Sequence, residues 1–146
     1  MIRTILVAVN DSSAAFRAAT EATGLCAALG ARLVAVGVVA DHARAERLTS
    51  VSGLSDPQAR QATAIAAVLR HVRSAAEGAG VETRACCLSG RPAEQVLAEA
   101  RRSSADLIVI GRADRHGAGM PYIGTDAQRI LEFAAVPVLV VPPPEP

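Results

Sequence analysis

The chain has 146 residues, a length that suits one domain with a substantial core and is short for two. Apolar residues make up 51% of it, which argues against a disordered chain. Its 15 basic and 14 acidic residues nearly cancel, and it has two phenylalanines, one tyrosine and no tryptophan. The positive charge and the aromatic surface typical of nucleic-acid-binding proteins are both missing, so we expect no nucleic-acid partner.

The sequence shows no targeting or membrane segment. The apolar run at residues 5–9 is too short for the core of a signal peptide, and no stretch approaches the length that spans a membrane. The cysteines are odd in number, and Cys86 and Cys87 are adjacent, which does not suit a disulfide framework. We expect a cytoplasmic, reduced protein with no membrane partner.

In chain order, apolar and β-branched runs predict strands at residues 5–9, 33–39, 81–88, 107–110 and 136–141. The segments between them have the period of amphipathic helices. Their predicted buried faces contain Ala15, Ala18, Ala22, Leu25 and Leu29 in the first helix, Ile65, Val68, Leu69, Val72 and Ala76 in the second, Val96, Leu97 and Ala100 in the third, and Ala127, Ile130, Leu131 and Ala134 in the fourth. Strands that alternate with helices predict an α/β fold, an open parallel sheet with helices on both faces.

Two segments do not fit this alternation. Residues 41–57 are polar and are predicted to form a flexible surface loop, for which disorder is favoured over function. Residues 142–146 are almost entirely proline, which extends neither a helix nor a ladder, so an extended stub is predicted. Because no internal repeat is present, residues 1–146 are expected to form a single domain.

Two predicted strand ends carry residues suited to a ligand. Asn10 and Ser12 follow the first strand, and a glycine-rich segment that starts at Gly111 follows the fourth. In open α/β sheets, ligands bind beyond the carboxyl ends of the strands, where the strand order reverses. Glycine permits a close backbone approach, and the next helix offers free N–H groups to an anion. These features favour a nucleotide; helix capping by Ser12 and a plain surface loop are the simpler alternatives.

Two well-known nucleotide motifs are missing. No G-x-G-x-x-G follows the first strand, which argues against a Rossmann dinucleotide site, and no P-loop sequence with its lysine occurs in the chain. The histidines and cysteines lack the spacing of a zinc site, and no serine, histidine and acid set suits a hydrolase. The cysteines are expected to pack as small core residues.

The chain resembles the universal stress proteins, whose signature is a strand of the type D-L-I-V-[IVM]-G that leads into G-x-x-G, nine residues and then G-[ST]. Residues 106–111 match the strand, residues 115–123 match the spacer, and Gly124 and Thr125 match the closing pair. Residues 5–12, 90–97 and 134–141 resemble the opening strand, the entry of the third helix and the final strand of that family.

The resemblance implies a five-stranded parallel sheet of order 3-2-1-4-5, in which the first and fourth strands are neighbours. It also implies a pocket for an adenine nucleotide, ATP or AMP. The residues carried over to this pocket are Ala8, Val9 and Asn10 on the first strand, Val38 on the second, and Gly111, Arg112, Asp114, Gly117, Gly124, Thr125 and Asp126 around the phosphates.

Two residues depart from the family pattern: Asp114 replaces the second glycine of the signature, and Asn10 replaces the usual aspartate after the first strand. A carboxylate about 4 Å from a phosphate, at an effective dielectric near 20, is repelled by roughly 4 kcal/mol. Arg112, Arg115 and His116 are close in sequence and can offset part of this repulsion. The sequence therefore predicts a partly degenerate pocket and leaves AMP, a cyclic nucleotide or no ligand as alternatives to ATP.

The last predicted strand, from Val136 to Val141, contains Pro137 and an apolar edge that needs cover. Universal stress proteins, which the chain resembles, commonly dimerise through this strand, so the resemblance implies a homodimer. We interpret the chain as a stress-response regulatory module and not an enzyme, since no general base or metal-binding pair is evident near the glycine-rich loop. A functional ATP sensor and a slow ATP-hydrolysing enzyme are the alternatives.

Overall fold

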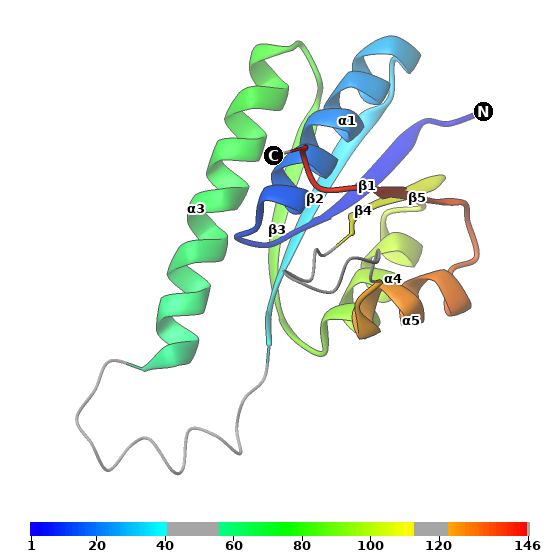
Figure 1. Cartoon of the computed structure of the whole chain (residues 1–146). Helices are drawn as coiled ribbons and strands as arrows, with labels where there is room; N and C mark the ends of the chain where they lie inside the picture. The colour runs from blue at the N-terminus through cyan, green and yellow to red at the C-terminus, as the bar shows by residue number, and fades with distance from the viewer. Residues whose placement is uncertain (41–55, 113–122, 146) are drawn as a thin grey trace.

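The computed structural model describes residues 1–40, 56–112 and 123–145, and within them five parallel strands form one sheet. The strand order is β3-β2-β1-β4-β5, which confirms the predicted order (Figure 1). The strands are β1 (Thr4–Val9), β2 (Arg32–Ala40), β3 (Thr83–Gly90), β4 (Leu107–Gly111) and β5 (Val138–Val141).

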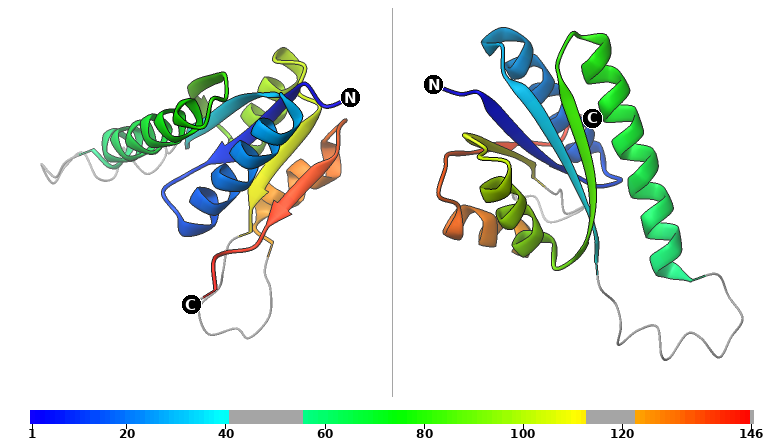
Figure 2. Two further views of the ribbon diagram at one scale, coloured as in Figure 1. Left: turned by 90° about the horizontal axis from the view of Figure 1, so that it is seen from above. Right: turned by 180° about the vertical axis from the view of Figure 1, so that it is seen from behind.

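The helices cover both faces of the sheet, as predicted. Contacts place α1 (Ser13–Leu29) and α3 (Pro57–Gly78) together against one face, while α4 (Pro92–Arg102) and α5 (Thr125–Phe133) pack together on the other side (Figure 2). Each face has its own apolar core, one built around α1 and α3 and the other around α4 and α5. None of the described helices has the length and apolar character needed to cross a membrane.

The central strand β1 supplies side chains to both cores. Ile5 and Val7 belong to the core under α1 and α3, whereas Leu6 belongs to the opposite core, and all three are fully buried. Successive strand residues point to opposite faces, so a strand covered on both sides is apolar at successive positions, here residues 5–9, while the buried Thr4 at its start has a hydrogen-bond partner in Arg32. This requirement explains why the sequence of β1 is a continuous apolar run.

Helix ends follow the sequence signals for capping. The Ser12 hydroxyl accepts a hydrogen bond from the Ala15 N–H (3.2 Å), and Asp56 accepts one from the Gln58 N–H (3.0 Å). Gly30 ends α1 in the left-handed conformation, with φ of 67°. Residues 41–55 of the predicted flexible loop lie outside the described residues, and Pro57, its last residue, is the first residue of α3.

Some predicted bounds and buried positions are wrong at the margins. β3 begins at Thr83 instead of residue 81, and β5 begins at Val138, because Pro137 has no N–H to donate to a ladder. Leu29 and Leu131 are exposed: Leu29 is the last residue of α1, and in α5 only Ile130 is fully buried. The periodicity of apolar residues identifies the buried face of a helix, but it does not show at which residue the neighbouring elements stop covering that face.

The three cysteines differ in burial. Cys26 on α1 is 1% exposed, and burial raises its pKa to about 11, so it packs as a neutral thiol, as predicted. Cys87 on the edge strand β3 is exposed, so its predicted core position is wrong. Cys86 is half-buried and lies 4.0 Å from the Glu99 carboxylate of α4. Burial raises the pKa of Cys86.

Glu99 connects α4 to the sheet as a buried carboxylate. Its side chain is 3% exposed, and it forms ion pairs with Arg84 of β3 (2.7 Å) and Arg102 of its own helix (3.4 Å). A buried charge is tolerated only when it is paired and hydrogen-bonded. The two arginines therefore compensate the buried charge of Glu99, and the pair with Arg84 holds α4 beside β3.

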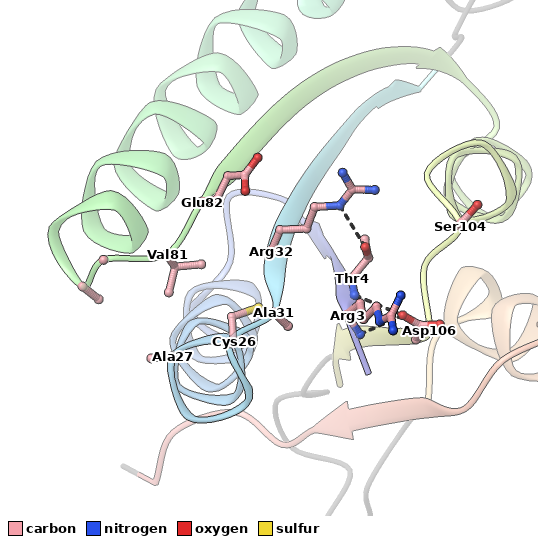
Figure 3. Close-up of a pocket in the computed structure, with 13 residues that line it drawn as sticks. Arg3, Thr4, Cys26, Ala27, Ala31, Arg32, Val81, Glu82, Ser104 and Asp106 are labelled. Atoms are coloured by element: carbon pink, nitrogen blue, oxygen red, sulfur yellow. Dashed lines mark hydrogen bonds between the residues drawn. The ribbon is translucent and has the colours of Figure 1, made fainter. Parts of the chain in front are cut away.

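At the amino ends of the strands, a hollow of about 650 Å³ contains polar side chains that bond to the chain itself (Figure 3). Asp106 accepts hydrogen bonds from the N–H groups of Arg3 (2.9 Å) and Thr4 (3.1 Å), and the Arg32 Nε–H donates to the Thr4 hydroxyl (2.9 Å). The N–H groups of Arg3 and Thr4 hold the pKa of the Asp106 carboxyl below its ordinary value. This carboxylate ties the start of β1 to the start of β4.

Asp106→Asn should lower the urea midpoint of unfolding at pH 7, because the charged acceptor is lost. A carboxyl whose pKa is lowered by folding stabilises the protein above its unfolded pKa, about 3.9, and loses that effect as the pH falls through its folded value. The difference between wild type and variant should therefore shrink below about pH 4. Urea titrations from pH 7 down to pH 3 measure this, with the exposed Glu21→Gln on α1 as control. A difference that stays constant with pH would contradict the role of the charge.

Candidate functional site

A cavity of about 1010 Å³ lies at the carboxyl ends of the central strands. β1 is paired with β2 on one side and with β4 on the other, so the strand order reverses here. This is the position at which open α/β sheets bind ligands. The wall from the sheet consists of Ala8, Val9, Asn10, Val38, Ala40, Ile110 and Gly111.

Six of the residues proposed from the sequence border this cavity: Ala8, Val9, Asn10, Val38, Gly111 and Asp126. Gly124 and Thr125 are the N-cap and the first residue of α5, directly before Asp126. Arg112 is not among the lining residues, and its N–H donates to the Val141 carbonyl (2.7 Å). Asp114 and Gly117 lie outside the described residues.

Asn10 is tied to the start of α1 but does not cap the helix. Its Oδ1 accepts a hydrogen bond from the Ser12 hydroxyl (2.5 Å), and Ser12 in turn caps the helix. Within the described part of the chain, the Nδ2 group of Asn10 takes part in no hydrogen bond. With respect to the described residues, two N–H donors at the end of β1 are therefore available to a polar ligand. The alternative of helix capping holds for Ser12, and Asn10 orients the capping serine.

Gly111 is required by the packing of β4 against α1. A Cβ at this position would lie 2.7 Å from the carbonyl carbon and oxygen of Ala14 and 3.0 Å from the Ala15 nitrogen. These are backbone atoms in the first turn of α1, so no side chain can move aside. Because glycine has no Cβ, the end of β4 packs directly against the first turn of α1, and both border the cavity.

Sequence reasoning missed several lining residues. Gln61 of α3 reaches the cavity and accepts a hydrogen bond from the Ala40 N–H (3.1 Å), and Val96 of α4 forms part of the opposite wall. Pro143 and Pro144, which follow β5, also line it. No local pattern marks these positions, because each reaches the cavity through a contact between elements that are distant in sequence.

The described wall is nearly neutral. Among the described lining residues, Asp126 is the one charged side chain, and none is a cation. Asp126 lies in the first turn of α5, where the helix dipole stabilises a carboxylate. The described wall therefore presents apolar, hydroxyl and amide groups and no positive side chain. Across the described residues, no group of three or more His, Cys, Asp or Glu side chains is placed to hold a metal ion.

Comparison with known proteins identifies relatives of the whole chain. The model of the Universal stress protein family matches residues 1–142. A universal stress protein of Thermus aquaticus is 34% identical over 143 residues, which cover 97% of this chain and 99% of the relative. One from Methanocaldococcus jannaschii is 36% identical over 77 residues, and the match spans 53% of this chain and 45% of that protein.

Solved structures share the fold. A universal stress protein of Archaeoglobus fulgidus in complex with dAMP has a TM-score of 0.69 at 22% identity, with 97% of this chain and 99% of that one covered. A universal stress protein in complex with cAMP has a TM-score of 0.69 at 22% identity and covers 98% of both chains. Both of these proteins hold an adenine nucleotide with one phosphate.

Gly111→Ala should destabilise the fold by about 1–3 kcal/mol, since the added methyl overlaps backbone atoms that cannot move without shifting α1. Gly24→Ala on α1 is the matched control: a Cβ there meets nothing within 4 Å, and alanine in a helix interior should stabilise by about 0.5–1 kcal/mol. Urea unfolding of both variants gives the free energies. Equal stability of Gly111→Ala and wild type would contradict the close packing of β4 on α1.

Proposed function

Because the chain belongs to the universal stress protein family, we propose that it is a cytoplasmic, homodimeric regulatory module of the stress response that holds an adenine nucleotide and catalyses no reaction. The observation that carries this proposal is the cavity at the reversal of strand order, bordered by the ends of β1, β2 and β4 and by the start of α5. The complexes of related folds with cAMP and dAMP support the choice of ligand.

The charge of the wall favours AMP or a cyclic nucleotide over ATP. Asp126 borders the cavity, and Asp114 occupies the position of a signature glycine in the sequence. Each additional phosphate brings more negative charge toward these carboxylates, whereas base and ribose gain from the apolar and amide wall. The repulsion grows with the charge of the ligand, so a nucleotide with one phosphate fits this pocket best.

Wild-type protein should bind AMP more tightly than ATP, and Asp114→Gly should increase the affinity for ATP by about tenfold or more, because a repulsion of a few kcal/mol is removed. Nucleotides released by denaturation are identified by mass spectrometry, and AMP and ATP are then titrated calorimetrically. Asp126→Asn separates the contribution of the second carboxylate.

Two results of this experiment would favour other functions. Tighter binding of ATP than of AMP by the wild type would favour the ATP sensor. Sustained release of inorganic phosphate, measured when the same protein is incubated with ATP, would favour the slow hydrolytic enzyme. An unchanged ATP affinity in Asp114→Gly would contradict a position of that carboxylate beside the phosphates.

The edge strand β5 supports the homodimer in this proposal. Val138 and Val140 are half-buried and Leu139 is 39% exposed, which leaves apolar surface at one margin of the sheet. In the described residues β5 pairs with β4 alone, so its other edge has unpaired backbone groups. A second copy that adds its own β5 would satisfy these groups and cover the apolar side chains.

The wild type should sediment as a dimer at micromolar concentration, and Leu139→Lys should weaken that dimer by about tenfold or more, because a charge would enter the covered surface. Leu29→Lys is the matched control, since Leu29 is exposed at the far end of α1. Analytical ultracentrifugation over a concentration series measures both dissociation constants. Monomeric wild type at these concentrations, or equal effects of the two lysines, would contradict dimerisation through β5.

A further inference from the structure

The chain that leaves β5 is held by an arginine from α1. The last ladder contact is the Arg112 N–H to the Val141 carbonyl (2.7 Å). Beyond it, Arg17 donates through Nη1 to the carbonyl oxygens of Pro142 (3.3 Å) and Pro143 (2.9 Å). The stub predicted from the sequence therefore has a definite position in its described part, residues 142–145.

The position of this tail matters because it borders the cavity. Pro143 and Pro144 line the cavity together with the first turn of α1, from Ser12 to Ala15. Arg17 lies one turn further along the helix and does not line the cavity. Its guanidinium donates to backbone carbonyl oxygens and does not face the ligand. The arginine acts on the cavity only through the prolines that it holds.

The residue types suit this arrangement. Proline carbonyls are acceptors on a segment without N–H donors, and a proline-rich chain is stiff and extended, so fixing it costs little conformational entropy. A guanidinium can donate to two carbonyls in a fixed geometry. Two hydrogen bonds from one side chain are thus enough to set the direction of the tail.

We propose that Arg17 is a positioning residue of the nucleotide site, which holds Pro143 and Pro144 as an apolar wall against the bound ligand. This inference rests on the proposed function. The tail is a wall and not a plug, since the cavity keeps about 1010 Å³ with the prolines in place. Contact with the prolines slows release of the nucleotide, so loss of the wall raises the dissociation constant.

Calorimetric titration of AMP tests the proposal. Arg17→Ala should raise the dissociation constant about three- to tenfold, as expected for partly exposed hydrogen bonds of a charged donor. The double variant Pro143→Gly/Pro144→Gly should raise the dissociation constant by a similar factor. It tests the proposal even if Arg17→Ala folds poorly. Arg73→Ala is the matched control, because Arg73 pairs with Glu77 on the exposed side of α3.

A combined variant separates positioning from a general structural role. If Arg17 acts only through the prolines, Arg17→Ala together with Pro143→Gly/Pro144→Gly should weaken AMP binding no more than either change alone. In parallel, the heteronuclear NOE of the Glu145 amide should fall in Arg17→Ala and stay high in Arg73→Ala.

The outcomes distinguish this proposal from the proposed function. Wild type that binds AMP while Arg17→Ala binds it equally well overturns the wall and leaves the function intact. Tighter binding without the prolines overturns it in favour of a plug, and additive effects of the two changes overturn the positioning role. Failure of the wild type to bind AMP overturns both.

Discussion

The close approach of β4 to the start of α1 is the constraint on which the ligand cavity depends. At Gly111, even a single Cβ would lie 2.7 Å from backbone atoms of Ala14. Because that atom is missing, the end of the strand reaches the first turn of the helix, and the ends of β1 and β4 border one cavity. The same turn of α1 leads to Arg17, so the position of the tail depends on this packing as well.

The two ends of the sheet use their polar groups differently. At the amino end, Asp106 and Arg32 bond to backbone and hydroxyl groups of β1, and these bonds stabilise the fold. At the carboxyl end, Asn10 makes one bond through Oδ1, and the wall beside it is apolar. At the amino end, the recorded bonds of Asp106 and of Arg32 Nε are therefore made within the fold, whereas at the carboxyl end the described partners of Asn10 leave its Nδ2 group available to a ligand.

The sequence predicts the centre of the fold well, because a strand buried on both faces must be a continuous apolar run and a helix on a sheet must show one apolar stripe. The margins are less predictable: Cys87 and Leu29 have core-like residue types but lie where cover ends. The same division holds for the cavity. Residues at strand ends, such as Val38, are named by the family resemblance. Gln61 and the prolines reach the cavity through contacts between distant residues, such as Arg17 and Pro143, which are 126 positions apart. No local period encodes such a contact.

The near-neutral wall of the cavity and the charged residues near the glycine-rich segment would have different roles in binding a nucleotide. In the proposed nucleotide complex, base and ribose would meet groups held by the sheet, by α1 and by the prolines, which would select a ligand by shape and burial. Under the same proposal, discrimination between one phosphate and three would depend on charged residues that the sequence places at Asp114, Arg115, His116 and Asp126. The scaffold that positions the nucleoside is therefore separate from the residues that set the charge of the ligand. If the proposal holds, a few substitutions in that segment would change which nucleotide is bound without altering the packing of Gly111 on α1.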